Sequence, residues 1–258
     1  MKIITSEMLA MTYNELVEYL LDKYGNVKYD YYTTLEHKSV QKKNSRTSEG
    51  LEIHHIDENK YPSLSTREFA DKAPYECQKA DRLVYANVLE HLLLHIKIDE
   101  EDAAIRVENG QRLCLCNIGE IMINIRINDY FAKDSFKNWH ENMAKVIRNN
   151  FDDYISELVY YLTLCSIYEP DRLLALINGV SQKWDGKIND KVLNALHEKC
   201  IDILPIKAGD KIKHKKYGKG VVEKICFFTD KFIVFDAMFE KKGLKNISSN
   251  DEFEIIKS

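Results

Sequence analysis

"GLEIHHIDEN" (residues 50–59) and "DRLVYANVLEHLLLHI" (residues 81–96) decide the fold of the first part of this chain. "GLEIHHI" predicts a short strand, and residues 82–86 are rich in β-forming side chains and predict a second. Asn87 followed by Glu90 makes an N-x-x-E capping box, so a helix should begin there. The connection over residues 56–81 is too long for a tight hairpin, and "STREFADKA" (65–73) within it predicts a short helix.

Four of the eight histidines of the chain fall in these two stretches. Positions four apart lie on one face of a helix, so His91 and His95 can present two imidazoles to one metal ion. Side chains alternate across a strand, so only one of His54 and His55 can point at that ion, and the other is left facing outward. Packed core histidines or chance spacing would explain each pair separately, but the combination predicts a metal site. A metal beside a free imidazole suits phosphodiester hydrolysis, with the imidazole taking a proton from water.

Upstream of these stretches, residues 12–24 predict a helix. Thr12 and Glu15 form a T-x-x-E capping box, and Gly25 stands where a helix commonly ends. The polar segment 37–50 is basic and can be either a solvated loop or a DNA-contacting loop. The basic residues of this segment are Lys38, Lys42, Lys43 and Arg46.

Downstream, residues 100–200 read as mainly helical, with 112–127 ambiguous between helix and strand. The residue pattern of the sequence changes at Pro205. After it, glycines at 209, 218, 220 and 243 separate short runs rich in β-forming residues. This pattern predicts a small antiparallel barrel of about five strands. We therefore expect an α+β protein with three regions: 1–100, 101–204 and 205–258.

The composition limits the class of protein. The chain has 258 residues, is 45% hydrophobic and 30% charged, and carries a formal net charge of −4, so any nucleic-acid surface should be a local patch. No apolar run reaches 18 residues and no signal peptide is recognisable, so we expect a cytoplasmic protein without a membrane partner. The six cysteines include no C-x-x-C pair, which favours reduced thiols over disulfides or a cysteine-built zinc site.

Residues 46–98 resemble the HNH, or ββα-metal, endonucleases. The resemblance rests on "LEIHHIDEN" followed by "DRLVYANVLEHLLLHI". It implies a ββα-metal nuclease motif within a mainly helical domain, with His54, His91 and His95 as metal ligands and His55 as the general base. At the position of the middle asparagine of this family the chain has Arg82. Asp81, or another residue of the 56–81 segment, is then expected to pin the loop that orients the base, and Asn87 to cap the helix.

Residues 207–256 resemble the Tudor-like tail of UvrD/PcrA-type DNA helicases, a small SH3-like barrel. Gly209, His214, Gly218 and Gly220 fall in register with the opening of that barrel. The resemblance implies contacts with a nucleic acid or a protein partner, and a packing or turn role for His214. Lysines here can track phosphates or can protect an edge strand from aggregation. The candidates for DNA contact are Lys213, Lys215 and Lys216.

These observations lead to one expected function and two alternatives. The expected function is a DNA endonuclease, in restriction, phage biology or anti-phage defence, that depends on a divalent metal ion (Mg²⁺, Mn²⁺, Ni²⁺ or Zn²⁺). The first alternative is a non-catalytic DNA- or protein-binding adaptor with a structural zinc. The second is an RNA nuclease with the same metal chemistry.

Overall fold

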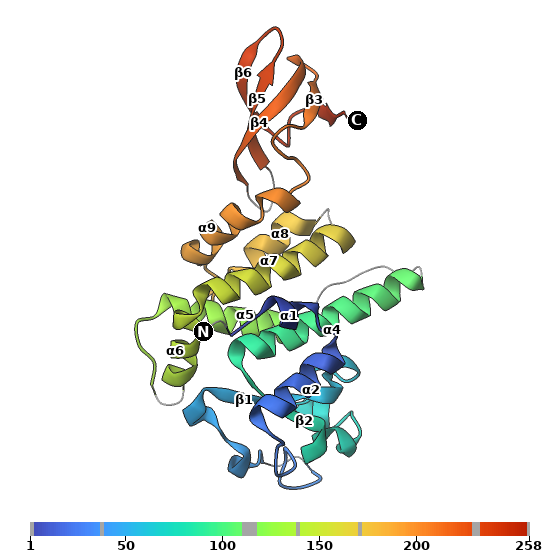
Figure 1. Ribbon diagram of the computed structural model, residues 1–258, viewed down its shortest axis with the longest axis vertical. Coiled ribbons are helices and arrows are strands. Elements are labelled where there is room, and N and C mark those ends of the chain that lie inside the picture. Colours follow the sequence, from blue (N-terminus) through green and yellow to red (C-terminus); the bar gives the residue numbers. More distant parts are fainter. Residues whose placement is uncertain are drawn as a thin grey trace. The chain divides into compact units, whose positions relative to one another are not determined.

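The computed structural model (Figure 1) describes residues 3–36, 39–109, 118–137, 140–169, 172–228 and 233–256, and combines helices with two antiparallel sheets. The α+β class is confirmed. The chain folds as two compact units. The first comprises Met1–Glu157 and Lys183–Lys187, and the second comprises Leu158–Gln182 and Ile188–Ser258. The three regions expected from the sequence, with a boundary near residue 205, stay a prediction.

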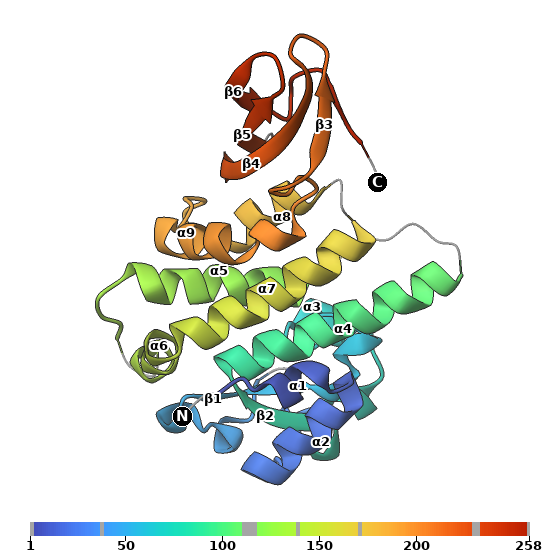
Figure 2. The ribbon, with the colours of Figure 1, turned by 45° about the horizontal axis from the view of Figure 1, so that its top comes forward.

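The first unit opens with α1 (Ser6–Ala10) and α2 (Tyr13–Tyr24). The expected capping box is present at α2: the Thr12 hydroxyl accepts from the Glu15 amide, and the Glu15 carboxylate accepts from the Thr12 amide. Gly25 ends the helix with φ 76°, a left-handed conformation that disfavours residues with a side chain. Helix α2 lies beside β2 and α4 (Figure 2) and buries Tyr13, Leu16 and Leu20.

Strands β1 (Leu51–His55) and β2 (Leu83–Asn87) pair antiparallel, with His54 opposite Val84 and His55 opposite Leu83. Helix α4 (Val88–Glu108) follows directly. Asn87 caps it by accepting from the amides of Leu89 and Glu90. The predicted order of strand, strand and capped helix is therefore confirmed. Every residue of β2 is buried, so this pair of strands is anchored against the core from which α4 starts.

Short turns fill the connection between the strands. They are η3 (Ile56–Asn59), α3 (Arg67–Ala70), η4 (Tyr75–Gln78) and η5 (Ala80–Arg82), and α3 lies inside the predicted short helix at 65–73. Arg82 makes a two-point ion pair with Asp57, from Nε at 2.7 Å and from Nη2 at 2.5 Å. This pair fixes the turn that follows His55 to the start of β2. Before β1, the basic segment forms η1 (Lys42–Asn44) and η2 (Thr47–Glu49).

Beyond α4 the described chain is helical up to residue 203, as expected. The helices are α5 (Ile118–Ala132), α6 (His140–Asn149), α7 (Phe151–Tyr168), α8 (Leu173–Val180) and α9 (Asp190–Lys199), followed by the turn η7 (Ile201–Ile203). The part of the ambiguous stretch from 118 to 127 belongs to α5, while residues 112–117, with Cys114 and Cys116, lie outside the described residues. Lys38 lies outside them too. The division between the two units falls within α7.

The second unit ends in a five-stranded antiparallel sheet in the order β6-β5-β4-β3-β7. Its strands are β3 (Lys211–His214), β4 (Gly218–Phe228), β5 (Ile233–Phe239), β6 (Gly243–Ser248) and β7 (Phe253–Ile255). The number of strands matches the expectation, but the barrel does not: among the described residues β6 and β7 are unpaired edges, so the sheet is open. One face buries Ile212, Phe235 and Phe239. His214 is also buried, accepting from the Lys216 amide and stacking on Tyr217, which is the expected turn and packing role.

Candidate metal centre

Four side chains of the first unit converge on one point. His54 comes from β1, Glu58 from the turn η3, and His91 and His95 from successive turns of α4, with one ligand atom of each lying within 4.8 Å of the others. The three histidines expected as ligands are thus brought together. Such a group could hold a metal ion.

Tyr13 sets the orientation of the His54 ring. The Tyr13 hydroxyl donates to the carbonyl oxygen of Ile56 at 2.8 Å, so its oxygen accepts from Nε2 of His54, also at 2.8 Å. The hydrogen of this imidazole is therefore on Nε2, and its lone pair is on Nδ1. Nδ1 is buried, has no hydrogen-bond partner among the described residues and lies 3.7 Å from Oε2 of Glu58. Burial, followed by the neighbouring His91 and His95, holds the pKa of His54 well below its usual value, which keeps the imidazole neutral as a metal requires.

Glu52 orients His91 in the same way. Nδ1 of His91 lies 2.7 Å from Oε1 of Glu52, which also receives Nη2 of Arg126 at 2.5 Å. A carboxylate on one ring nitrogen directs the lone pair of the other nitrogen at the metal, as in carboxylate–histidine–zinc triads. Burial alone would raise the pKa of Glu52, but Arg126 and His91 outweigh it and hold that pKa at about 2. Glu52 is therefore a permanent negative charge behind the ligand.

His95 completes the set of imidazoles. Its Nε2 lies 3.3 Å from Nε2 of His91 and 3.3 Å from Oε2 of Glu58. Gly119, in the first turn of α5, lies directly against the ring: a Cβ atom there would approach Cε1 of His95 to 2.2 Å. Only glycine allows α5 to come this close, so Gly119 belongs to the structural support of the site.

Glu58 was not among the residues singled out from the sequence. Its Oε2 faces His54 and His95, while its Oε1 accepts from the amide of Leu64 at 3.0 Å and lies 4.0 Å from Nδ1 of His55. Burial raises the pKa of this carboxyl to about 7. An acidic residue in a polar turn usually signals solvent exposure, and its place three residues after the histidine doublet was the only available signal.

His55, the expected general base, lies next to the cluster without being part of it. The Gln78 side-chain amide donates to the carbonyl oxygen of Leu64 at 3.2 Å, which leaves its Oε1 to accept from Nε2 of His55 at 3.0 Å. The lone pair of His55 is then on Nδ1, the atom nearest to Glu58. We expected this histidine to face outward, but its residue is only 1% exposed because it packs on Tyr31 and Gln78. Burial lowers the pKa of His55 to about 4.

The residues expected to orient His55 lie at different places in the structure. Asp81 is exposed in η5, and the hydrogen bond to the His55 ring comes instead from Gln78, another residue of the 56–81 segment. Arg82, at the position where the resemblance to HNH nucleases would place an asparagine, holds the η3 turn through Asp57. Asn87 caps α4 by accepting from two backbone amides of that helix, and its side chain also hydrogen-bonds Tyr24 of α2.

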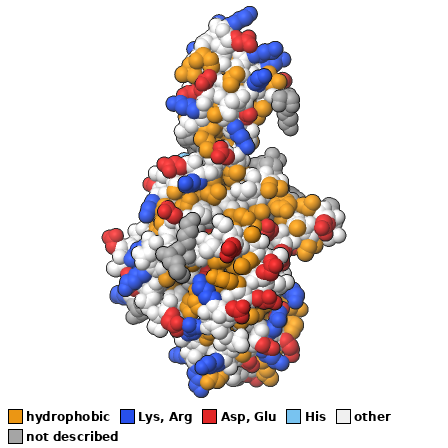
Figure 3. Space-filling model, viewed as in Figure 1, with side chains coloured by type: hydrophobic (Ala, Val, Ile, Leu, Met, Phe, Trp, Pro, Cys, Tyr) orange, Lys and Arg blue, Asp and Glu red, His pale blue; other side chains and the backbone are white. Residues whose placement is uncertain are grey.

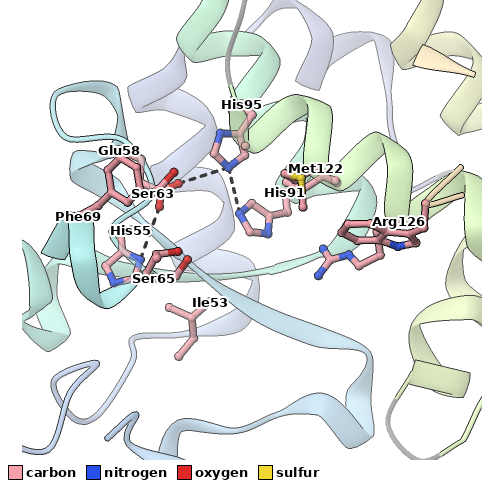
Figure 4. A pocket seen from close by; sticks show the side chains of 14 residues that line it. Ile53, His55, Glu58, Ser63, Ser65, Phe69, His91, His95, Met122 and Arg126 are labelled. Carbon is pink, nitrogen blue, oxygen red and sulfur yellow. Dashed lines mark hydrogen bonds and ion pairs between the residues drawn. The ribbon is translucent and has the colours of Figure 1, made fainter. Parts of the chain in front are cut away.

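A cavity of about 450 Å³ opens beside the cluster (Figure 4). His55, Glu58, His91 and His95 border it on one side and Arg126 on another. His54 and His95 are buried and Glu58 and His91 are half-buried, and this group lies beside a space in which another molecule can be bound. A closed structural site would not need such a space.

The expected DNA-contacting residues of the first unit differ in exposure and in how many contacts their charged groups make. Lys42 and Lys43 are exposed, with the Lys43 ammonium 5.4 Å from the centre of the Tyr29 ring. Arg46 is largely engaged: its guanidinium donates to both carboxylate oxygens of Glu49 and to the carbonyl oxygen of Tyr24. Arg46 therefore has structural contacts, and Lys42 and Lys43 are the accessible cations within the described part of this segment, 39–50.

The expected lysines of the second unit lie at β3 and the turn that follows it. Lys213 is exposed, Lys215 forms an ion pair with Glu252, and Lys216 lies 5.3 Å from the centre of the Tyr217 ring. On the face shown in Figure 3, Lys and Arg side chains alternate with Asp and Glu. The view thus shows no large patch of a single charge among the described residues.

Comparisons of the chain with protein-family models, with curated proteins and with solved structures find no match. Across the described residues, no helix is long and apolar enough to cross a membrane.

Proposed function

We propose that the protein is a metal-dependent endonuclease of the HNH type that hydrolyses phosphodiester bonds in DNA. One observation carries the proposal: three imidazole nitrogens and one carboxylate oxygen converge beside a further, oriented imidazole and a cavity. His54, Glu58, His91 and His95 would hold the ion. A set of three nitrogens and one oxygen suits Zn²⁺ or Ni²⁺ better than Mg²⁺, which prefers oxygen ligands.

A bound divalent ion supplies Lewis-acid stabilisation of the charge that develops on the phosphate and on the leaving oxygen. The chain supplies the rest. Nδ1 of His55 accepts the proton of the attacking water as the water oxygen bonds to phosphorus and the bond from phosphorus to the leaving oxygen of the strand breaks. Gln78 keeps the imidazole in the tautomer that can accept this proton. Glu52 and Tyr13 hold the ligand rings at their angles.

A second candidate function, a binding protein with a structural zinc, is favoured by one specific observation. Glu58 supplies a fourth protein ligand, and four protein ligands are the usual complement of a structural zinc site. In that case His55 would have no task in catalysis. The two functions therefore differ in what the loss of His55 does.

The test compares His55→Ala and His91→Ala with the wild type, and uses His197→Ala on α9 as a histidine control outside the cluster. Metal content is measured by mass spectrometry, and cleavage of plasmid and of circular single-stranded DNA is followed with Zn²⁺, Ni²⁺, Mn²⁺ or Mg²⁺. We expect His55→Ala to keep its metal and lose cleavage by about 10²–10⁴-fold, the usual contribution of a positioned base. His91→Ala should lose both metal and cleavage. A structural zinc predicts instead that His55→Ala is silent and that His91→Ala unfolds the first unit.

A further inference from the structure

Two cavities of the first unit meet at the candidate metal centre. The one beside the histidines has a volume of about 450 Å³, and a second has about 440 Å³. Both are lined by Ile53, Ser65, His91 and Arg126. A molecule bound at His91 therefore has space on two sides.

The first cavity has walls suited to a flat, amphipathic group. Phe69 and Trp184 provide aromatic faces, Met122 adds apolar surface, and Ser63 and Thr66 provide hydroxyl groups. Trp184 lies in the 183–187 segment of the same compact unit and is 53% exposed, so its ring remains available to a ligand. Aromatic rings that are accessible to solvent are the usual stacking platforms for unpaired nucleobases.

The second cavity has a basic lining. Lys42 and Arg46 lie in its wall, and Lys42 is exposed. Arg126 borders both cavities: its Nη2 pairs with Glu52, and its Nε has no hydrogen-bond partner among the described residues. Cations along this path match the regular negative charge of a sugar–phosphate chain.

Building on the endonuclease function proposed above, we infer that the substrate is an unpaired strand of nucleic acid. With its phosphodiester at the metal centre, one flanking nucleobase enters the first cavity against Phe69 and Trp184. The strand continues through the second cavity past Lys42. A base in a duplex is stacked on both faces and paired at its edge, so it can enter such a cavity only after leaving the helix.

The experiment measures binding apart from cleavage. The full-length His55→Ala protein is titrated with three dye-labelled ligands, and fluorescence anisotropy is recorded: a single-stranded oligodeoxynucleotide, its duplex, and an abasic strand with the same number of phosphates. We expect the single strand to bind more tightly than the duplex or the abasic strand. Phe69→Ala or Trp184→Ala, added to His55→Ala, should weaken binding of the base-bearing strand about 5- to 150-fold and leave the abasic strand unaffected.

Tyr61→Ala is the matched control, because Tyr61 is an exposed aromatic of the same 56–81 segment that does not line the cavity. It should bind all three ligands as the parent does. Trp184 is more than half exposed, so its truncation tests the inference even if Phe69→Ala fails to fold. Equal binding of single strand and duplex, or an equal loss with base-bearing and abasic strands, would overturn the inference.

The binding experiment and the cleavage assay can fail separately. Plasmid cleavage by the wild type with no base-dependent binding would leave the endonuclease proposal standing and remove the cavity assignment. Base-dependent binding that is lost in Trp184→Ala, in a protein that cuts nothing, would support the cavity and refute the endonuclease.

Discussion

At the residue scale, the site depends on side chains that fix the tautomers of others. Tyr13 leaves the lone pair of His54 on Nδ1, Glu52 leaves that of His91 on Nε2, and Gln78 leaves that of His55 on Nδ1. A partner on one ring nitrogen of a histidine fixes both its tautomer and the angle at which the other nitrogen can meet a metal. The supporting residues are therefore as informative about metal binding as the ligands themselves.

The contact between Gly119 and His95 gives a prediction about metal affinity. A methyl group at Gly119 would lie 2.2 Å from Cε1 of His95, so the ring must move away from the cluster. We expect Gly119→Ala to weaken metal binding about 10- to 100-fold, as loss of a supporting residue commonly does, and to leave the circular dichroism spectrum unchanged. Competition with a chelating dye measures the affinity.

Gly179→Ala is the control for this substitution. Gly179 lies in helix α8, and a Cβ atom there meets nothing within 4 Å. The affinity of the Gly179→Ala protein for metal should equal that of the wild type. Wild-type affinity in Gly119→Ala as well would show that His95 is not needed as a ligand.

Glu157 gives a prediction about pH. It lies on α7, fully buried, and neither carboxyl oxygen has a hydrogen-bond partner among the described residues. Burial, with the nearby charges of Glu90 and Asp153, raises the pKa of this carboxyl well above 4.5. The folded state therefore keeps a proton that the unfolded chain loses near pH 4.5. Stability contributed by this group falls as pH rises above that value, by up to about 1.4 kcal/mol per pH unit.

Glu157→Gln should remove this dependence and make the protein more stable at pH 7 than the wild type. Urea unfolding at several pH values from 5 to 7.5 measures the free energy of unfolding of both proteins. The exposed Glu18 on α2 provides the control variant, Glu18→Gln, which should follow the wild type. A constant difference between Glu157→Gln and the wild type across this range would show that Glu157 does not hold its proton in the folded state.

At the element scale, α4 carries two ligands and its start determines where they lie. Its capping box joins Asn87 to Glu90, and Glu90 is itself bound by Lys23 and Tyr24 of α2. The first turn of α4, which contains His91, is thus tied both to the end of β2 and to α2.

Asn87→Ala tests whether this residue has any task beyond the cap. Loss of an N-cap costs about 1 kcal/mol, so the free energy of unfolding should fall by roughly that amount. Metal content and plasmid cleavage should remain at the wild-type level, because Asn87 binds the helix backbone and not the base. Denaturant unfolding beside the cleavage assay separates the two effects. Loss of cleavage with unchanged stability would give Asn87 the loop-pinning task of the family's asparagine.

At the scale of the whole molecule, the chain folds as two units and the candidate metal ligands all belong to the first. The sheet of the second unit buries Ile212, Val222, Phe235, Phe239 and Ile247 in a core of its own. Metal binding should therefore stabilise one unit and leave the other unchanged.

Calorimetry with and without metal tests this. A ligand at 100 times its Kd stabilises the state that binds it by about 2.7 kcal/mol, so the transition of the first unit should move up after metal is added and down after chelation. A fragment of residues 205–258 should show β-type circular dichroism, melt cooperatively and be indifferent to metal. A metal-dependent melt of that fragment, or a helical spectrum, would contradict the assignment.

Part of this structure could be predicted from the sequence, because it depends on interactions between residues close together in the chain. The capping boxes at Thr12 and Asn87 lie within four residues, and the pairing of His91 with His95 follows from helix geometry alone. Of the doublet only His54 belongs to the cluster, as alternation across a strand predicts, whereas His55 is buried beside it and does not face outward. The five C-terminal strands were visible for the same reason, as runs between glycines.

The rest depended on interactions between distant parts of the chain. Tyr13, Gln78 and Gly119 reach the histidines from other elements, and nothing in their neighbouring residues marks them. Glu58 is near His55 in sequence, but only burial turns this turn residue into a ligand candidate. Whether five strands close into a barrel is likewise set by the pairing of the first and last edges, which is absent between the described parts of β6 and β7. The periodicity of hydrophobic residues predicts which face of a helix or strand is buried. Only tertiary packing determines which residues that face contacts.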